Sequence, residues 1–279
     1  MGSPINFKIR AKEKSKKDMD MIFELVIVIP TYNEAKRLSP KKYFNFLKQH
    51  EDVMLCFVND GSVDKTDAVL RHIQQAGQKN VTILEHSKNK GKAAAVLSGF
   101  LYGAAKIPHK KIAYLDADLS TSLEECYALS QNINEQTVFV FGSRIRKLDN
   151  FIRRKPYRFY IGRVMATMIS RQLNLYVYDT QCGCKIFSHQ LAQKVMAEKF
   201  VSTWLFDVEI FHRIQNLYGK RRLVGFSKEV PLHSWIDKDQ SKVSFSYFFK
   251  MWSELVIIRR KYRMTTFKEP QTVLIEALA

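Results

Sequence analysis

The most constraining feature of this sequence is a repeated alternation between short apolar runs and longer segments with helical spacing. Apolar runs at 25–29, 53–58, 81–84, 111–115 and 137–141 predict buried strands. Helices are predicted between them at 40–49, from Asp64, as a capping residue, to Ala76, and at 92–105. Strands that alternate with helices indicate βαβ units, so we predict an α/β fold with a mostly parallel sheet and helices on both faces.

Clusters of polar residues follow four of the predicted strands. They are Thr31-Tyr32-Asn33-Glu34, Asn59-Asp60-Gly61-Ser62, Asp116-Ala117-Asp118 and Gly142-Ser143-Arg144. One such cluster alone is compatible with a simple turn or a helix cap. Ligands of open α/β sheets bind outside the carboxyl ends of the strands, so four clusters in register predict a binding site at that edge.

Asp116 and Asp118 are the strongest candidates for chemistry in this set. Residues i and i+2 of an extended segment point the same way, so the two carboxylates can share one cation. A hard divalent ion, Mg²⁺ or Mn²⁺, takes such oxygen ligands and also binds substrate phosphates. The pair therefore predicts a metal–diphosphate site in which the metal stabilises a departing diphosphate.

Two further clusters are candidates for nucleotide contacts. The carboxylate of Asp60 can accept from the N–H of a uracil or from ribose hydroxyls, and Gly61 can relax the turn that follows. Lys90, Gly91 and Lys92 open a predicted helix, where backbone N–H groups and ammonium charges can hold phosphate. The surrounding residues do not fit a Walker motif.

The charge of the chain narrows the class of partner. Lys and Arg number 45 against 27 Asp and Glu, which gives a formal net charge of +18. This balance indicates a polyanionic partner such as nucleic acid, an anionic membrane surface or a phosphorylated substrate. A nucleic-acid-binding protein is disfavoured, because no zinc finger, helix-turn-helix or RNP-like signature is present.

The cysteines and the lengths of the apolar runs argue against a disulfide-rich, zinc-binding, membrane-spanning or secreted protein. Cys56, Cys126, Cys182 and Cys184 form neither a disulfide framework nor a zinc-ligand set, so we expect buried, unreactive thiols in a reducing compartment. No stretch has the apolar length of a membrane span. Residues 1–20 lack the apolar core of a secretory signal and contain several lysines.

The second half of the chain mixes aromatic and basic residues. Segments 151–174 and 244–263 read as amphipathic helices with basic edges, which fits either packing on the core or contact with a membrane interface. We favour membrane contact. The predicted organisation is a basic tail at 1–21, a single domain at 22–265 with a C-terminal amphipathic helical elaboration, and a second tail at 266–279.

The order of these motifs resembles that of family 2 glycosyltransferases. The resemblance is carried by Val28-Ile29-Pro30-Thr31-Tyr32-Asn33-Glu34, Asn59-Asp60-Gly61-Ser62, Asn89-Lys90-Gly91-Lys92, Asp116-Ala117-Asp118 and Gly142-Ser143-Arg144. In the second half, Asp179-Thr180-Gln181-Cys182-Gly183-Cys184-Lys185, Phe206-Asp207-Val208-Glu209 and Ser241-Lys242 resemble dolichyl-phosphate β-glucosyltransferases and bacterial polyprenyl-phosphate glycosyltransferases.

The resemblance implies a Rossmann-like nucleotide-binding fold of the GT-A type and assigns roles to individual residues. It implies a nucleotide-sugar pocket formed by Pro30, Tyr32, Glu34, Asp60, Lys92, Asp116 and Gln181. It also implies catalytic roles for Asp118, Asp207 and Arg144, metal ligation by Asp116 and Asp118, and binding of the acceptor phosphate by Arg144, Arg158 and Lys242.

The sequence departs from the family pattern at several places. Asn59 stands where the family often has an aspartate, and no N-terminal membrane span is present. Gly162 stands where mannosyl relatives have a serine four residues after the arginine that Arg158 matches. Lys238 and Lys242 are the candidates to replace the arginine that relatives have before the Ser-Lys pair, and an ammonium lacks the bidentate fork of a guanidinium.

The implied activity is inverting transfer of a sugar from a UDP-sugar to a polyprenyl phosphate. UDP-glucose is the favoured donor, with UDP-GlcNAc as an alternative. A lipid phosphate is already anionic, so the enzyme needs no general base and must instead position and neutralise two anions. We expect the enzyme to lie on the cytoplasmic face of a membrane, attached peripherally to its anionic surface.

Two alternatives use the same site. An acceptor with a sugar hydroxyl requires a general base, for which Asp207 is the first candidate and Glu209 the second. A nucleotidyltransferase also uses paired carboxylates, but it releases pyrophosphate where a glycosyltransferase releases a nucleoside diphosphate.

Overall fold

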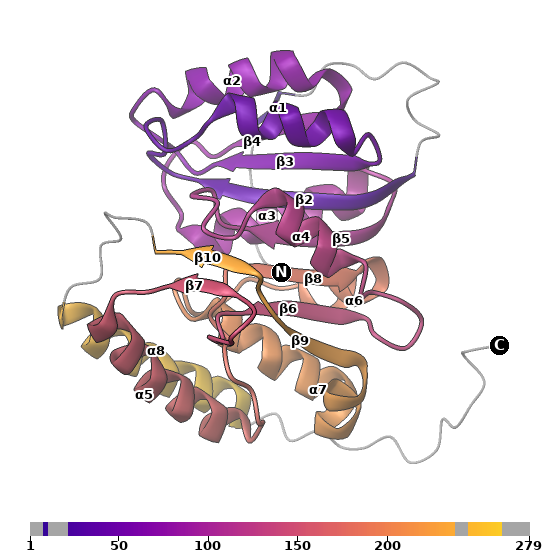
Figure 1. Cartoon of the computed structure of the whole chain (residues 1–279). Coiled ribbons are helices and arrows are strands. Elements are labelled where there is room, and N and C mark those ends of the chain that lie inside the picture. Colours follow the sequence, from indigo (N-terminus) through magenta and orange to yellow (C-terminus); the bar gives the residue numbers. More distant parts are fainter. Residues whose placement is uncertain (1–7, 11–21, 238–244, 264–279) are drawn as a thin grey trace.

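A large mixed sheet forms the centre of the molecule (Figure 1). The computed structural model describes residues 8–10, 22–237 and 245–263. Within them, the strand order is β1-β4-β3-β2-β5-β8-β6-β9. These strands are β1 (Lys8–Arg10), β2 (Phe23–Thr31), β3 (Val53–Asn59), β4 (Val81–Glu85), β5 (His109–Leu115), β6 (Phe139–Ser143), β8 (Cys184–Ser188) and β9 (Ser227–Pro231).

The pairing of the strands confirms the predicted parallel arrangement and adds to it. Strands β4, β3, β2 and β5 run parallel, and so do β6 and β9. Strand β8 is antiparallel to both of its neighbours, β5 and β6. Strand β1, within the predicted basic tail, forms one edge of the sheet, pairs antiparallel with β4 and was not predicted. The rest of both predicted tails lies outside the described residues.

Helices cover both faces of the sheet, as the alternating pattern predicts. They are α1 (Pro40–Gln49), α2 (Thr66–Gly77), α3 (Lys92–Lys106), α4 (Leu123–Ser130), α5 (Pro156–Leu173), α6 (His189–Val195), α7 (Phe206–Phe226) and α8 (Phe245–Arg263), with a short 3₁₀ turn at Gln78–Asn80. Helices α1, α2 and α4 pack on one face, and α3, α6 and α7 pack on the other. Every residue of β3 is buried, as expected for a strand covered on both faces.

The C-terminal half departs from the prediction at one boundary. The segment predicted as one helix at 151–174 begins with a short strand, β7 (Phe151–Arg153), which pairs parallel with β10 (Ser234–Ile236). The helix itself starts at Pro156, a residue that favours the first helical position because it lacks an N–H. Helices α5 and α8 both pack against α7, at the lower left of Figure 1.

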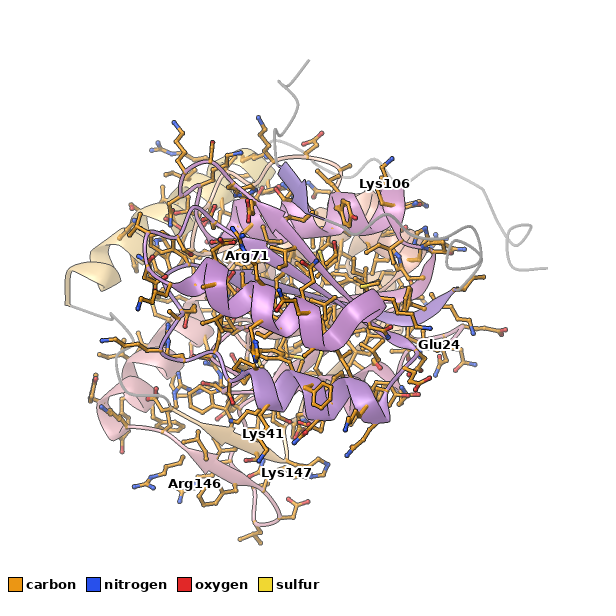
Figure 2. The ribbon with its side chains drawn as sticks, turned by 90° about the horizontal axis from the view of Figure 1, so that it is seen from above. Glu24, Lys41, Arg71, Lys106, Arg146 and Lys147 are labelled. Atoms are coloured by element: carbon orange, nitrogen blue, oxygen red, sulfur yellow. The ribbon has the colours of Figure 1, made fainter. Side chains whose placement is uncertain are left out.

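The basic surface is visible from above the α1–α2 layer. Lys41, Arg71, Lys106, Arg146 and Lys147 reach outward there (Figure 2). Arg71 is paired with Asp67 one turn earlier on α2. All five basic residues are exposed, so their charges are solvated and do not define a site by themselves.

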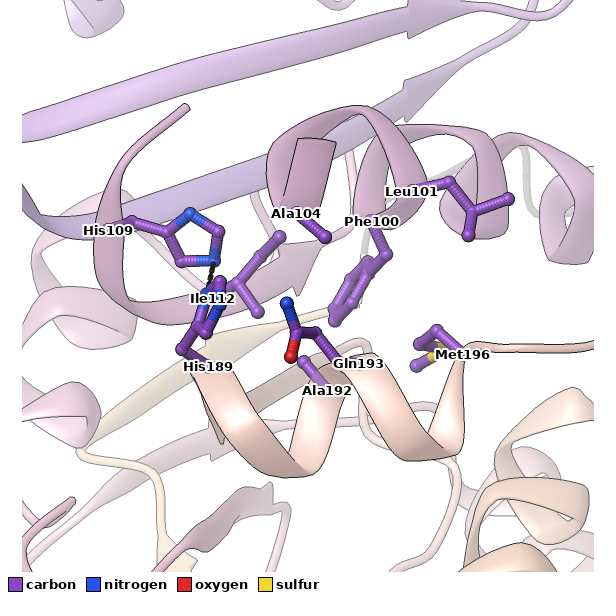
Figure 3. Close-up of a pocket in the computed structure, with 9 residues that line it drawn as sticks. All are labelled: Phe100, Leu101, Ala104, His109, Ile112, His189, Ala192, Gln193 and Met196. Carbon is purple, nitrogen blue, oxygen red and sulfur yellow. Dashed lines mark hydrogen bonds between the residues drawn. The ribbon is translucent and has the colours of Figure 1, made fainter. Parts of the chain in front are cut away.

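A small cavity lies at the amino end of β5, at the opposite end of this strand from Asp116 (Figure 3). It measures about 90 Å³ and lies between α3, β5 and α6. At one side of it His189 Nδ1 lies 3.0 Å from His109 Nε2. The predicted site lies elsewhere, at the carboxyl ends of the strands.

Candidate active site

The polar clusters that follow β2 and β3 meet at the carboxyl edge of the sheet. The last residues of these strands, Thr31 and Asn59, are register partners. Beyond them, the Asn33 amide donates to Ser62 Oγ at 3.1 Å, and Asn33 Oδ1 accepts from the Val63 amide at 2.9 Å. The two loops thus form one rim, and Tyr32 is exposed on it.

Asp60 lies beneath this rim and holds the loop that leads into α3. Its side chain is buried, with Oδ1 accepting from the Lys90 amide at 2.9 Å and Oδ2 from the Gly91 amide at 2.8 Å. Oδ1 also lies 2.6 Å from His86 Nδ1, and the other ring nitrogen of His86 lies 2.9 Å from Ser98 Oγ. Asp60 therefore fixes the start of α3, while its predicted contact with the nucleotide stays a prediction.

Gly61 lets the β3 loop approach the chain before α3. Its φ is +68°, and a Cβ there would lie 2.5 Å from the carbonyl carbon of Lys88. A side chain at this position would meet backbone atoms and would occupy a conformation that favours glycine. The prediction that Gly61 relaxes the turn is confirmed by its φ.

Three carboxylates and one ammonium gather at the end of β5. Lys92 Nζ lies 2.5 Å from Asp116 Oδ1, and Asp118 Oδ1 accepts from the Ser120 amide at 2.9 Å. Burial raises the pKa of Glu34, Arg37 lowers it, and Asp118 and Asp116 raise it further. Burial lowers the pKa of Lys92, but the nearby carboxylates, led by Asp116, outweigh that effect and raise it.

This group fits a hard divalent cation in its donor chemistry. Asp116 and Asp118 offer only oxygen atoms, which Mg²⁺ and Mn²⁺ prefer. The Lys92 ammonium already lies against Asp116, so a positive charge is favourable at this position. Within the described residues, no three His, Cys, Asp or Glu side chains form a complete metal site. Substrate phosphates and water would therefore have to supply the remaining ligands.

Asp207 lies deeper, at the first turn of α7, in a buried pair with Lys185 of β8. Lys185 Nζ lies 2.6 Å from Asp207 Oδ1 and 2.9 Å from both Tyr114 Oη and the Cys182 carbonyl oxygen. The Tyr114 hydroxyl also donates to Asp207 Oδ1. Burial raises the pKa of Asp207 to about 7 and lowers that of Lys185 to about 8.

Arg144 and Asp179 form a second pair, at the end of β6. Arg144 Nε and Nη2 donate to the two carboxylate oxygens of Asp179 at 2.6 and 2.8 Å. Asp179 Oδ1 also accepts from the Gln181 amide, and the Asp179 amide donates to Glu229 on β9. Burial acts to raise the pKa of Asp179, but the guanidinium of Arg144 outweighs burial and lowers this pKa to about 2. The arginine is therefore held in a fixed orientation.

Arg154 lies near Arg144 and Asp179, and it was not predicted as a site residue from the sequence. Burial and the neighbouring Arg144 lower the pKa of Arg154 to about 10, so two guanidinium groups lie close together. A Cβ at Gly162 would lie 2.6 Å from Arg154 Nη2, so the missing side chain on α5 makes room for this guanidinium. The feature of the sequence that could have indicated Arg154 is Gly162, which stands where mannosyl relatives have a serine. The side chain of Arg158, and the whole of Lys238 and Lys242, lie outside the described part of the structure.

All four cysteines are buried and form no disulfide, as predicted. Gly183, between Cys182 and Cys184, leaves space for Asp116, because a Cβ there would lie 2.1 Å from Asp116 Oδ2. The Asp116 amide also donates to the Gly183 carbonyl at 3.0 Å. This turn therefore supports the position of the first acidic residue.

The mostly parallel sheet carries a carboxylate cluster and basic residues at its carboxyl edge, as the resemblance to glycosyltransferases of the GT-A type implies. The model of the family described as "Glycosyl transferase family 2" matches residues 26–196, and the chain belongs to this family. Among curated relatives, a dolichyl-phosphate beta-glucosyltransferase of Trichomonas vaginalis is 31% identical over 259 residues, covering 88% of this chain and 75% of that protein. The Homo sapiens dolichyl-phosphate beta-glucosyltransferase is 27% identical and covers 89% and 79%.

Solved structures show the same fold at low identity. Glucosyl-3-phosphoglycerate synthase from Mycobacterium tuberculosis, solved with UDP, has a TM-score of 0.61 at 13% identity, over 92% of this chain and 87% of that one. A mannosyltransferase from Pyrobaculum calidifontis, solved with GDP-mannose and Mn²⁺, has a TM-score of 0.57 at 16% identity, over 91% and 67%. These similarities confirm the predicted fold class.

Proposed function

We propose that this glycosyltransferase moves a sugar, with glucose favoured, from a UDP-sugar to dolichyl phosphate or a related polyprenyl phosphate. The relatives named above act on dolichyl phosphate by their names, and they support this acceptor. Complexes of the Mycobacterium tuberculosis synthase, which shares the fold, contain UDP or UDP-glucose and support a uridine nucleotide donor.

The observation that carries the acceptor assignment is the guanidinium pair of Arg144 and Arg154. Among the described residues, Asp179 is the carboxylate that pairs with Arg144. Its two oxygens accept from Nε and Nη2 of that guanidinium. Within the described residues no ion pair joins Arg154 to a carboxylate, and its pKa is lowered by burial and by Arg144. Asp179 and Asp237 act against these two effects, and the net shift of the Arg154 pKa stays downward. A bound phosphate would accept from both planar guanidinium groups and offset their mutual repulsion.

The donor side of the site is formed by Lys92, Asp116 and Asp118. A bound Mg²⁺ or Mn²⁺, held by the two aspartates, would neutralise the diphosphate of the donor. Lys92, at the N-terminus of α3, lies beside Asp116 and adds a positive charge to the same region. Pro30, Tyr32, Glu34 and Gln181 are proposed to border the nucleotide-sugar.

The transfer needs no proton acceptor if the nucleophile is a phosphate. A phosphate oxygen attacks the anomeric carbon, the bond from that carbon to the diphosphate oxygen breaks, and UDP leaves with the electron pair. Direct displacement inverts an α-linked donor into a β-linked product. The enzyme contributes by holding the two anionic substrates against each other and by neutralising them.

Asp207 fits this scheme as a structural partner of the site. Its Oδ1 accepts from Lys185 and Tyr114, so that oxygen is occupied by donors. We propose that the Asp207–Lys185 pair orients the donor sugar. A sugar-hydroxyl acceptor remains the second candidate, because a pKa of about 7 suits a general base.

A membrane surface is the proposed location of the reaction. On α5, the exposed residues Tyr157, Tyr160, Ile161 and Val164 recur at helical spacing and form one apolar stripe. On α8, Trp252, Val256 and Ile257 are exposed beside Arg259 and Arg260. Within the described residues no helix is long and apolar enough to cross a bilayer. We propose peripheral contact with an anionic cytoplasmic leaflet, which such basic, aromatic helices favour.

The experiment that tests this function follows UDP release from UDP-glucose with Mn²⁺ or Mg²⁺, with and without a short-chain polyprenyl phosphate. The account predicts release that depends on the lipid and is lost on chelation. Asp118→Asn should lower the rate by at least about 100-fold, because the proposed metal loses a ligand, while Asp149→Asn, an exposed carboxylate paired with Lys147, should behave as the wild type. The lipid-phosphate assignment would be overturned if several UDP-sugars were tried and UDP were released only when the acceptor carried a sugar hydroxyl.

A further inference from the structure

The N-terminus of α7 lacks a capping side chain of its own. Its N-cap residue is Leu205, whose side chain cannot accept a hydrogen bond. The first turn of a helix leaves backbone N–H groups without intrahelical partners, and these need acceptors. In this molecule one acceptor is Ser202 Oγ, which accepts from the Leu205 amide at 2.7 Å, and a second acceptor comes from a different helix.

Glu254 of α8 supplies the second acceptor and holds the residues that lead into α7. Glu254 Oε2 accepts from the Trp204 and Leu205 amides, both at 3.2 Å, and from Ser202 Oγ at 2.5 Å. Its other oxygen accepts from Thr203 Oγ1 at 3.2 Å. The side chain is 8% exposed. A buried carboxylate with these charge-assisted bonds also complements the positive end of the α7 dipole.

The segment that Glu254 holds lies directly against the candidate site. Phe206 and Asp207 follow it, and Asp207 is paired with Lys185. The Phe206 ring lies 5.7 Å from Lys92 Nζ. On the other side, a Cβ at Gly91 would lie 3.8 Å from Thr203 Cβ. Residues 202–205 therefore lie between Glu254 and the start of α3.

We propose that Glu254 is a positioning residue for sugar transfer, an assignment that rests on the proposed function. By capping α7, it sets the position of Asp207, and through Phe206 and Thr203 it sets the position of Lys92. Loss of its charge leaves the 202–205 segment free to shift relative to the donor. Small displacements of substrate-positioning groups cost large factors in rate.

Helix α8 has other contacts that keep it in place without Glu254. Leu255 and Ile258 are buried in the core, and Tyr262 Oη donates to Glu209 of α7 at 2.8 Å. A Glu254→Gln variant keeps the shape of the side chain and one acceptor oxygen. We therefore expect it to fold, so its activity can be measured.

The test compares Glu254→Gln with Glu198→Gln, an exposed carboxylate on the segment after α6. UDP release with UDP-glucose and a short-chain polyprenyl phosphate gives kcat and the KM of the donor. Glu254→Gln should lower kcat by about tenfold and leave the donor KM within about twofold, because the loss lies in positioning and not in binding. Glu198→Gln should match the wild type.

A second measurement does not depend on the reaction. Hydrogen exchange of the peptide that contains residues 202–207 should become at least about tenfold faster in Glu254→Gln, because the Trp204 and Leu205 amides lose their charged acceptor. A variant with a lower Tm but unchanged kcat and exchange would overturn the assignment and leave a structural role. A wild-type enzyme without lipid-dependent UDP release would overturn the proposed function and this assignment together.

Discussion

Most charged residues of the candidate site are held in pairs. Lys92 is paired with Asp116, Lys185 with Asp207, and Arg144 with Asp179. Each pair fixes the direction of a long side chain that would otherwise sample many rotamers. Arg154 differs, because burial and the charge of Arg144 lower its pKa more than the charges of Asp179 and Asp237 raise it. An anion that binds there gains from both guanidinium groups.

Arg154 gives the most specific prediction at this scale. Arg154→Ala should raise the KM for a polyprenyl phosphate by at least about tenfold, because one charge-assisted contact to phosphate is lost. The KM for UDP-glucose should change by less than about twofold, since the proposed donor site lies beside Asp116 and not beside Arg154. Steady-state kinetics with each substrate varied in turn gives both values.

The neighbouring Arg153 provides the matched control, because its side chain is exposed. Arg153→Ala should leave the acceptor KM close to that of the wild type. An acceptor KM that responds equally to both substitutions would show that Arg154 acts only through the net charge of the surface.

Gly61 gives a prediction about stability. Gly61→Ala should lower the free energy of unfolding by on the order of 2–4 kcal/mol, because it adds left-handed strain and a clash with the Lys88 backbone. Urea denaturation measures this change. Gly225→Ala, where the added Cβ meets nothing within 4 Å, is the control and should stay within about 1 kcal/mol of the wild type. Equal urea midpoints for Gly61→Ala and the wild type would refute the close approach of position 61 to the Lys88 backbone.

The sequence indicated the acidic residues of the site but not its second arginine. Asp116 and Asp118 follow a buried strand, so their position at the sheet edge could be predicted from pattern alone. Arg154 lies between Arg153 and Lys155, and no spacing rule separates one of these three cations from the others. Their roles depend on the turn into α5, which brings Arg154 over Gly162. The buried pairing of Asp207 with Lys185 also joins residues whose proximity only the fold creates.

At the scale of elements, prediction succeeded where hydrophobic patterns are continuous. Strands β2 to β6 lie within a few residues of the predicted runs, as do α1, α2 and α3. Strands β7 and β10 are three residues each and half exposed, so no alternating pattern marks them. Strand β8 contains the buried charge of Lys185, which breaks the apolar run that a central strand usually shows.

The contact between α7 and α8 gives a prediction about pH. His212 of α7 stacks on Tyr262 of α8, with ring centroids 5.2 Å apart. Burial lowers the pKa of His212 to about 4, against about 6.5 in an unfolded chain. The unfolded state therefore binds a proton at higher pH than the folded state. The contribution of neutral His212 to the free energy of unfolding is fully present above pH 6.5 and is lost as the pH falls toward 4.

Denaturant titrations at pH 7 and pH 4.5 measure this effect. The wild type should lose about 2–3 kcal/mol more between these two values than His212→Gln, which has no titrating ring. The comparison of the two pH differences removes the contributions of the other titrating groups. Parallel losses in both proteins would exclude His212 as a source of acid sensitivity.

At the scale of the whole molecule, helices α5 and α8 both expose apolar side chains close to basic ones. Helix α5 presents its apolar stripe, including Tyr160 at 69% exposure, and α8 presents Trp252 at 51%. The net charge of +18 adds a general attraction to anionic surfaces. Apart from β1, the predicted basic tail at 1–21 and the predicted C-terminal tail at 266–279 lie outside the described residues, so α5 and α8 are the surfaces on which membrane contact can be tested.

Vesicle sedimentation tests this surface. The protein should bind vesicles that contain anionic lipid more tightly than zwitterionic ones, and high salt should weaken the binding because surface charges are screened. Tyr160→Ser together with Trp252→Ser should reduce binding by about tenfold or more, since two aromatic side chains leave the interface. Val224→Ser, on the C-terminal part of α7, is the control for an exposed apolar residue. Binding that is unchanged in the double variant would place the membrane contact elsewhere.

The central claim is that the sugar is delivered to a lipid phosphate, and analysis of the product tests it most directly. Wild-type protein would be incubated with UDP-glucose, Mn²⁺ and dolichyl phosphate, and the lipid would be extracted for mass spectrometry and NMR. The account predicts one hexose joined to the phosphate through a β-linkage, because a phosphate oxygen displaces UDP directly. A lipid that is unmodified while UDP is released, or a hexose joined in the α configuration, would contradict it.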